Sequence, residues 1–439
     1  MGMGRKVKKR NRRKKNRRGS FGRAFLVTFT VTLAAGGCAL GIFLIWNQVR
    51  DGGADPVISE IARIEEEDIP VRHEQKPEST EAAEDAEPEK AGEESAREDD
   101  GFDGDGCIRD ENGRILEKKV ETAGEEATLL FAGDILFDDG YAMMGSLRKR
   151  GNIRACFSAE TLAEMAEADI FMLNNEFTYT SRGEPTPEKQ FTFRAKPENA
   201  ALLHELGVDI VSLANNHAYD YGEISLLDSL TTLEGIGMPY VGAGRNLEEA
   251  SRTIYFYAGN QKIAYISGTM IERQDNPDTK GATESAPGVF RCFSEKKIFD
   301  RIAEAKETGS FVVVYIHWGT EKTEKPDWSQ PDMAKKLVDA GADLIIGDHP
   351  HVLQPLTGIN DTPVIYSVGN YWFNSSTLDT CLVKVKVKDG EMQSFQFLPA
   401  RQSDCYTELL YGAEKDAVLN YMRGISPGVT IDAEGYVGF

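Results

Sequence analysis

The sequence has few of the residues on which several common kinds of site depend. Its six cysteines are scattered over 439 residues and include no C-x-x-C pair. Their spacing therefore supports neither a cysteine zinc site nor a complete disulfide framework. Histidine is equally scarce, with six residues in the whole chain, and no internal repeat is present. Any metal site must therefore be built from oxygen ligands and a few imidazoles.

Basic residues are also missing from most of the chain. Twelve of the 50 Lys and Arg residues lie in the first 23 positions, which contain no Asp or Glu, and the whole chain carries a formal charge of -21. The remainder is strongly acidic. Because an acidic surface repels a phosphate backbone, we expect no nucleic-acid partner. Hydrophobic residues make up 41% of the chain, which is enough for a packed core and excludes a fully disordered or fibrous protein.

An uncharged stretch follows the basic arm of residues 1–23. Residues 24–46, AFLVTFTVTLAAGGCALGIFLIW, are long enough to cross a bilayer as one transmembrane helix. The basic arm predicts a cytoplasmic N-terminus and an extracytoplasmic main domain, so we expect a single-pass protein of the cell membrane. A cleaved signal peptide is the alternative, although no convincing cleavage site follows the stretch. Lipidation at Cys38 is a further alternative.

Residues 47–126 differ in composition from the segments on either side. They are rich in Glu, Asp, Ala, Pro and Gly and contain almost no aromatic residues. Such a segment cannot bury enough apolar surface to offset the entropy lost on ordering. We predict a disordered acidic linker that holds the next domain away from the membrane. Binding of a partner by the acidic run is the alternative interpretation.

Residues 127–439 alternate short apolar runs with helical patterns. Continuous apolar runs indicate strands buried on both faces, and they lie at 128–134, 169–175, 209–217, 262–268, 311–319, 343–351 and 363–370. Helical patterns lie between them at Ser158–Ala168, Pro197–Leu206, Gly222–Leu233, Ser294–Thr308 and Gln330–Ala340. Strand and helix in alternation predict an α/β domain in which helices cover the sheet faces.

Polar residues gather where these apolar runs end, which is where α/β proteins place ligand sites. They are Asp134, Glu176, Asn216, His217, His317, Asp348, His349, His351 and Asn370. Oxygen and imidazole ligands without thiolates suit Mn, Fe, Zn or Mg. Taken singly, each residue is explained as well by a turn or a structural histidine.

Two of these residues have more specific chemistry. The Glu176 carboxylate can bridge two cations about 4 Å apart, an arrangement that orients water and stabilises a leaving oxygen. His217 can act as a general acid, with Asp220 fixing its tautomer.

Six segments together resemble a known family. They are FAGDILF (131–137), LNNE (173–176), FRAKPENAALLHELGVDIVSLANNHAYDYG (193–222), HWGTE (317–321), PDWSQPDMAKKLVDAGADLIIGDHPHVLQPL (326–356) and YSVGNYWF (366–373). They are similar, in the same order, to bacterial capsule synthesis proteins of the CapA (poly-γ-glutamate biosynthesis) type, whose domain is related to calcineurin-like metallophosphoesterases. The resemblance implies a layered sandwich of two mixed β-sheets flanked by helices. It also implies an extracytoplasmic role in making, exporting or attaching an anionic surface polymer, with membrane synthase or export proteins as partners.

The resemblance further implies a set of metal ligands, with one or two divalent ions as cofactor. The ligand candidates are Asp134, Glu176, Asn216, His317, His349 and His351, and His217 is the implied transition-state partner. Two positions depart from the metallophosphoesterase pattern. Leu136 stands where a histidine ligand is typical, which leaves one metal position short of a ligand, and Glu176 replaces the usual bridging Asp.

Three further residues are candidates for substrate binding. Arg194 offers a bidentate fork for a phosphate or carboxylate, and Lys196 lies beside it in the sequence. Asn175, next to the bridging position, is the third. Surface salt bridges explain Arg194 and Lys196 as simply.

Three functional interpretations remain open. The first is a membrane-anchored, metal-dependent hydrolase or transferase that acts on an anionic envelope polymer. The second is a non-catalytic subunit of a polymer export or anchoring complex with a degenerate metal site, which Leu136 favours. The third is an α/β domain whose polar strand ends merely complete turns. The acidic domain repels polyglutamate at long range, so polymer binding requires a local basic cleft or bound cations.

Overall fold

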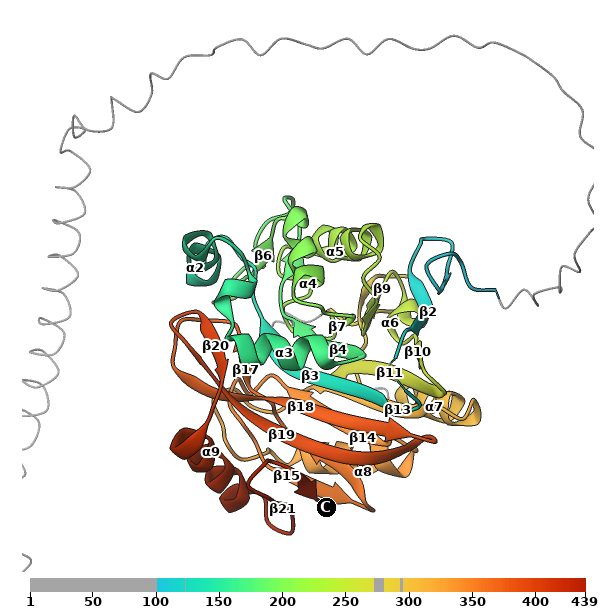
Figure 1. Ribbon diagram of the computed structural model, residues 1–439. Coiled ribbons are helices and arrows are strands. Elements are labelled where there is room, and N and C mark those ends of the chain that lie inside the picture. The colour runs from blue at the N-terminus through green and yellow to red at the C-terminus, as the bar shows by residue number, and fades with distance from the viewer. Residues whose placement is uncertain (1–100, 123, 272–279, 293–294) are drawn as a thin grey trace, which may run out of the picture. The chain divides into compact units, whose positions relative to one another are not determined.

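The computed structural model describes residues 101–122, 124–271, 280–292 and 295–439 (Figure 1). The predicted cytoplasmic arm, the predicted transmembrane helix and residues 47–100 of the predicted linker lie outside the described residues. Within the described ranges, no helix is both long enough and apolar enough to cross a membrane.

Eight strands form a mixed sheet, which we name the β13 sheet. In spatial order they are β1 (Cys107–Arg109), β2 (Ile115–Val120), β10 (Ile254–Ala258), β11 (Gln261–Thr269), β13 (Phe311–His317), β14 (Leu344–Asp348), β16 (Thr362–Ile365) and β15 (Leu356–Ile359). The four strands β11, β13, β14 and β16 are parallel neighbours, so their carboxyl ends meet at one edge.

A second mixed sheet, the β3 sheet, also has eight strands. Seven follow the order β20 (Tyr406–Leu409), β19 (Glu391–Ser403), β18 (Leu378–Lys388), β3 (Ala127–Ile135), β4 (Ile170–Asn175), β7 (Ile210–Ser212) and β8 (Tyr240–Val241). The short strand β17 (Asn370–Trp372) also pairs with β3. Strands β3, β4 and β7 are parallel, so this sheet too gathers carboxyl ends at one edge.

Helices and smaller strand pairs complete the fold. The helices are α2 (Ala142–Arg150), α3 (Ala159–Glu167), α4 (Ala201–Glu205), α5 (Glu223–Gly235), α6 (Leu247–Ala250), α7 (Glu295–Glu307), α8 (Ser329–Asp339) and α9 (Gly412–Ile425), with 3-10 turns at Arg154–Cys156 and Pro197–Ala200. The strand pairs are β5 (Thr178–Tyr179) with β6 (Arg194–Ala195), β9 (Ala243–Gly244) with β12 (Gly288–Val289), and β21 (Thr430–Ile431) with β22 (Val437–Gly438). The helices expected from the sequence are present. Four have ends within two residues of those predicted, and the one expected at Pro197–Leu206 is a 3-10 turn followed by α4.

Side chains of the central strands alternate between cores. On β3, Leu129 and Phe131 point into the core between the two sheets, whereas Leu130 and Ala132 contribute to the core under the outer helices. Because a strand buried on both faces needs apolar residues at successive positions, its sequence is a continuous apolar run. The prediction of doubly buried strands is therefore confirmed.

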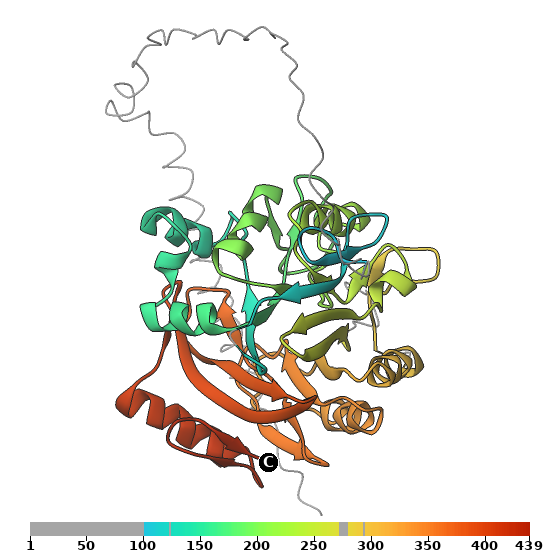
Figure 2. The ribbon, with the colours of Figure 1, turned by 45° about the vertical axis from the view of Figure 1, so that its right-hand side comes forward.

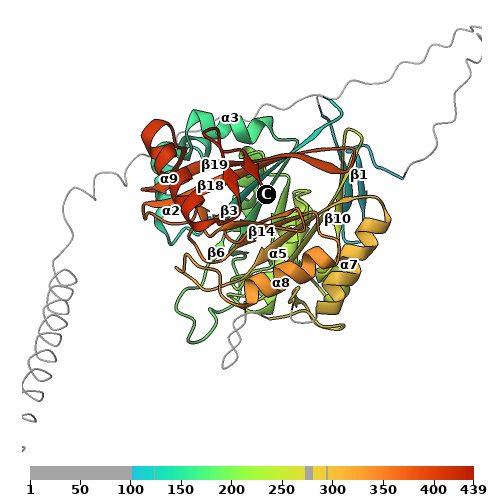
Figure 3. The same ribbon diagram turned by 90° about the horizontal axis from the view of Figure 1, so that it is seen from below.

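The cores separate four layers. Helices α2 to α5 pack on the outer face of the β3 sheet, and α7 and α8 pack on the outer face of the β13 sheet. Figure 2 shows α7 and α8 side by side as yellow and orange coils. In Figure 3, β3 and β14 lie between α3 and α8. The predicted arrangement of mixed sheets flanked by helices is confirmed.

The linker prediction is wrong for its last part. Residues 107–120 form β1 and β2, and β2 pairs in parallel with β10 at the edge of the β13 sheet. The Arg114 side chain is buried, and its two terminal nitrogens donate to the carbonyl oxygens of Glu249, at 2.7 Å, and Tyr240, at 3.0 Å. Edge strands have one polar face, so the acidic composition of this segment concealed its pairing.

Candidate metal centre

Side chains from both sheets converge at the carboxyl ends of the parallel strands. Asp134 lies at the end of β3, and Glu176 directly follows β4. From the other sheet, His317 ends β13, and Asp348 ends β14 in register beside it. The loops that follow β7 and β14 supply Asn216, His217, His349 and His351. Residues far apart in the sequence thus share one buried site.

A close approach of two chain segments shapes the β3 end of the site. β3 has a bulge between Phe131 and Asp134, and a Cβ on Gly133 would lie 1.7 Å from the carbonyl oxygen of Gly369. Only glycine permits this contact. The contact brings β17, and with it Asn370, beside Asp134.

Four residues form what we call the histidine group: Glu176, Asn216, His317 and His349. The Nε2 atom of His317 lies 2.8 Å from Asn216 Oδ1, 3.0 Å from His349 Nδ1 and 3.7 Å from Glu176 Oε1. Atoms bound at about 2.1 Å to one cation, at right angles, are about 3 Å apart. The histidine group therefore has the spacing of a set of metal ligands.

Three residues form the aspartate group: Asp134, Glu176 and His351. His351 Nδ1 lies 2.9 Å from Asp134 Oδ2, and His351 Nε2 lies 4.0 Å from Glu176 Oε1. Glu176 belongs to both groups, as expected of a bridging carboxylate. Leu136 is buried at the edge of this group and offers no ligand atom.

Unsatisfied polar atoms in the site show that the two groups fit a divalent cation. Glu176 is fully buried, yet its Oε1 atom has no hydrogen-bond partner. Neither carboxylate oxygen of the buried Asp348 makes a hydrogen bond, although Oδ2 lies 3.0 Å from His317 Nδ1. Buried polar atoms without partners are costly, and a cation between the groups would offset that cost. Imidazole, carboxylate and amide oxygen donors suit a first-row transition metal or Mg. Among the described residues, three ligand combinations could hold an ion, and all of them draw on these residues and Asp348.

Burial and neighbouring charges shift the pKa values of the cluster. Burial lowers the pKa of His317 and of His349 well below the usual range, and nearby imidazoles add to the shift. Both rings are therefore neutral, the form that binds metal. Burial, together with the charges of Asp134 and Asp348, raises the pKa of Glu176 well above its usual range. A cation at this point would remove that repulsion.

The loop after β14 holds two histidines in an uncommon backbone conformation. His349 has φ 91° and His351 has φ 59°, on either side of Pro350. Residues other than glycine rarely adopt positive φ, and such strain clusters at functional sites. The backbone N–H of Lys322 donates to the Pro350 carbonyl at 2.8 Å and holds the loop in place. The strained turn directs both imidazoles into the cluster.

His217 lies beside the histidine group in a chain of charged contacts. Its Nδ1 lies 2.6 Å from Asp220 Oδ2, and Lys189 Nζ lies 2.5 Å from Asp220 Oδ1. Asp220 Oδ2 also accepts the Phe193 backbone N–H at 2.6 Å. A carboxylate oxygen accepts hydrogen bonds, so this contact favours the His217 tautomer that carries its proton on Nδ1. Nε2 then faces Glu176 Oε1 at 4.0 Å. The geometry matches the expected pairing of His217 with Asp220.

A cavity of about 370 Å³ opens onto the cluster. Its wall includes His217 and His351, and aromatic side chains form much of the remainder. The aromatic residues are Tyr141, Phe191, Phe193 and Phe373. The Phe193 ring packs on His217 with centroids 4.3 Å apart. A ligand that enters this cavity meets His217 and His351.

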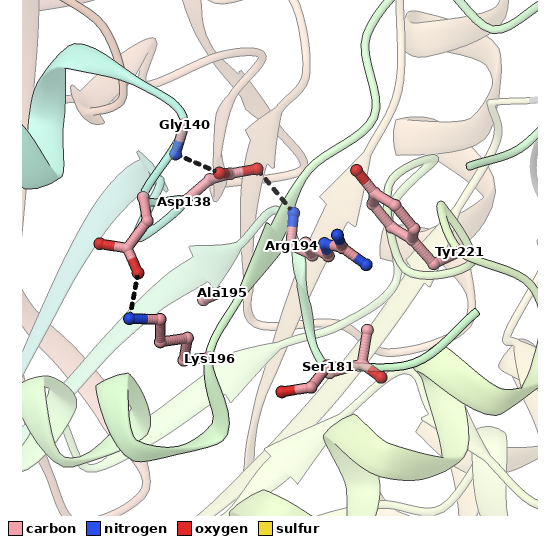
Figure 4. Close-up of a pocket in the computed structure, with 9 residues that line it drawn as sticks. Asp138, Gly140, Ser181, Arg194, Ala195, Lys196 and Tyr221 are labelled. Carbon is pink, nitrogen blue, oxygen red and sulfur yellow. Dashed lines mark hydrogen bonds and ion pairs between the residues drawn. The ribbon is translucent and has the colours of Figure 1, made fainter. Parts of the chain in front are cut away.

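The predicted substrate residues are not all placed together. Arg194 and Lys196 line a second cavity of about 480 Å³, shown in Figure 4. Asn175 is fully buried, with its side-chain nitrogen donating to the Phe177 carbonyl at 2.8 Å, and it lines neither cavity. A substrate-binding role for Asn175 stays a prediction.

Several residues that hold the cluster in place received no role from the sequence. Asn174 donates to Asp134 Oδ1 at 2.9 Å, and Asn215 donates to Asn174 Oδ1 at 2.9 Å. Asn370 Oδ1 lies 2.7 Å from His351 Nδ1. Asn174 and Asn215 adjoin expected ligands in LNNE and LANNH, which is the signal that could have found them, and Asn370 is one of the polar strand-end residues noted in the sequence. Lys189 lies in a polar segment without a motif, so no local signal marks it.

Fold and site together define a class: an α/β protein with two mixed sheets, whose facing strand ends hold a buried histidine and carboxylate cluster that could bind a metal ion. A family model described as bacterial capsule synthesis protein PGA_cap matches residues 128–375, a range that contains every residue of both groups. The chain belongs to this family.

Curated relatives agree with the family. The chain is 30% identical over 295 residues to the PGA biosynthesis protein CapA of Bacillus subtilis (strain 168), covering 65% of this chain and 75% of the relative. It is 31% identical to the capsule biosynthesis protein CapA of Bacillus anthracis, covering 48% and 52%. It is 28% identical to a probable polyglutamine synthesis accessory protein of Mycobacterium tuberculosis, covering 56% and 69%.

Proposed function

We propose that this protein is a metal-dependent hydrolase or transferase that acts on a poly-γ-glutamate type of capsule polymer. Family membership and the names of the CapA relatives support the polymer. The observation that carries the chemistry is the convergence of Asn216 Oδ1, His349 Nδ1 and the unpartnered Glu176 Oε1 around His317 Nε2. Turn residues that merely complete hydrogen bonds would not leave a buried carboxylate oxygen unsatisfied.

The residues divide into holding and reacting roles. Asp134, Glu176, Asn216, His317, His349 and His351 would hold one or two divalent ions. A divalent ion bound there supplies a Lewis acid and an activated water or other nucleophile. The chain's own contribution to proton transfer is His217, because Asp220 fixes its Nδ1 proton and leaves Nε2 to exchange a proton with the reacting group.

Localisation and partners belong to the same proposal. The apolar segment 24–46 would anchor the protein in the cell membrane, with the α/β domain outside the cytoplasm. Membrane synthase and export proteins are the partners we expect. Because the domain is acidic, polymer binding depends on local positive charge from bound ions and basic side chains.

A second function is favoured by Leu136. The aspartate group has three residues, and the buried Leu136 side chain adds no fourth ligand. A protein with one weak metal position can serve as a non-catalytic subunit of a polymer export or anchoring complex. In that case the cluster would bind and position the polymer without cleaving it.

Turnover of a defined polymer separates the two functions. Full-length protein, supplied in turn with Mn, Zn, Fe and Mg, is incubated with poly-γ-glutamate, and chain length and released ends are measured. We expect metal-dependent cleavage or transfer that His217→Ala abolishes. His204→Ala is the matched control, since His204 lies on α4 and contacts the Ile236 carbonyl outside the site. Wild-type protein that binds metal but leaves the polymer unchanged would support the non-catalytic subunit.

A further inference from the structure

The second cavity is separate from the metal cluster but shares a wall with it. Phe193 and Asp220 face His217, whereas the next residue in each segment, Arg194 and Tyr221, lines the second cavity. Successive residues of two adjacent segments thus serve two cavities. The two cavities are therefore separated by a wall of these two segments, and a ligand in the second cavity lies on the opposite side of that wall from His217.

Arg194 is the exposed cation of this cavity. Its guanidinium lies over the Tyr221 ring, 4.4 Å from the ring centroid, and Figure 4 shows the side chain extending toward that ring. In the part of the chain that the structure describes, no carboxylate lies within ion-pair distance of this guanidinium. Stacking on Tyr221 holds the planar group while its N–H edge stays open to a ligand.

The carboxylates of the two acidic residues in the cavity already have hydrogen-bond or ion-pair partners. Both carboxylate oxygens of Asp138 accept backbone N–H groups, from Gly140 at 2.7 Å and from Arg194 at 2.9 Å. Asp139 pairs with Arg148 at 2.6 Å and with Lys196 at 3.3 Å. The Arg194 guanidinium therefore remains as the local positive charge that a ligand can neutralise.

The ligand chemistry follows from this arrangement. A stacked guanidinium presents two parallel N–H groups in one plane, which match a planar carboxylate. The two neighbouring carboxylates disfavour a doubly charged phosphate more than a singly charged carboxylate. We propose that the Arg194 cavity binds a free carboxylate of the polymer, on the other side of the wall that carries His217. This inference rests on the proposed function, because in a γ-linked glutamate chain each residue keeps its α-carboxylate.

Binding of a short γ-linked glutamate oligomer to the full-length protein tests the inference. Calorimetric titrations are carried out with and without a chelator, so that the result does not depend on the metal. We expect Arg194→Ala to weaken binding about tenfold or more in both conditions, and Arg194→Lys to weaken it less. Tyr221→Phe, which keeps the ring, should bind as wild type, whereas Tyr221→Ala should bind more weakly. Arg154→Ala is the matched control, since Arg154 is exposed and contacts only the Glu205 carbonyl.

Three results would overturn the inference. If Arg194→Ala binds the oligomer as well as wild type does, the cavity is not the binding site. An equal loss of affinity in Arg154→Ala would show that binding depends on overall charge. Inorganic phosphate that displaces the oligomer at equal concentration, in an Arg194-dependent manner, would make the cavity a phosphate site. Failure of the proposed function has a different signature. If the oligomer binds in an Arg194-dependent manner but no metal-dependent turnover is observed, the proposed enzymatic function is wrong and the carboxylate site is retained.

Discussion

The two nitrogens of the buried His317 ring face different partners: Asp348 Oδ2 lies 3.0 Å from Nδ1, and the candidate ligands approach Nε2. Asp348 is fully buried and neighbours His317 in the sheet. A carboxylate behind a ligating imidazole orients the ring and increases its basicity. Asp348, which is not one of the expected ligands, therefore orients the ring of His317, which is.

Asp348→Asn should weaken metal binding without changing the number of sites. The substitution keeps the shape of the side chain but removes its charge, and loss of such a partner typically costs about 10- to 100-fold in affinity. Competition with a chromophoric chelator measures the change. Asp339→Asn, at the exposed end of α8, is the control. An unchanged affinity would show that Asp348 has no role in metal binding.

Asp220→Asn should reduce turnover and leave bound metal unchanged. Without the charge, the His217 Nδ1 proton is no longer fixed, and the loss of a positioned general acid or base costs about 100-fold or more. Turnover and metal content are measured on the same preparation. Asp228→Asn removes a carboxylate that pairs with the exposed Arg182 and serves as the control. Equal losses of metal and turnover in Asp220→Asn would instead mean that Asp220 maintains the fold of the site.

Leu136→His should complete the aspartate group. The residue is buried, lines the cavity beside His351, and belongs to the strand end that carries Asp134. An imidazole there adds the fourth ligand that a closed site needs, so bound metal should rise by about one equivalent. Leu136→Met, which keeps the volume without a nitrogen ligand, should not raise it. No gain in Leu136→His would contradict the interpretation that this position limits occupancy.

A chain that begins at Ala127 should be less stable than one that begins at Gly101. The shorter chain lacks β1 and β2, so β10 becomes an exposed edge and two buried carbonyls lose the Arg114 side chain. Each unsatisfied buried acceptor costs about 1 to 3 kcal/mol. Chemical unfolding of both chains measures the difference in unfolding free energy. Equal stabilities would mean that the domain begins at residue 127, as the sequence predicted.

Much of the strand framework could be predicted because buried parallel strands leave a continuous apolar run. FVVVYIH and DLIIGD show this pattern, and both form central strands. The hairpin of β18 and β19 was missed, although residues 383–388, VKVKVK, alternate strictly between apolar and charged side chains. Such alternation is typical of a half-buried strand, and a prediction built on continuous apolar runs does not include it. The helices α2 and α9 were missed as well.

The candidate site could be predicted in its residue types but not in its connections. Parallel strands place their carboxyl ends at one edge, so Asp134 and His317 were expected near a common site. No local pattern indicates that Lys189 pairs with Asp220, because that contact depends on how a polar loop folds back on the domain. The separation of Arg194 from the metal cluster likewise depends on which side of a shared wall each residue faces.

Metal content is the measurement that tests the central claim most directly. Full-length protein is purified without chelator, and bound metal is determined by elemental analysis for wild type, for His349→Ala/His351→Ala and for His204→Ala. The account predicts about one or two equivalents of a divalent metal in wild type and in His204→Ala, and almost none in the double variant. Wild-type protein that binds no metal, even after incubation with Mn, Zn and Fe, would contradict it.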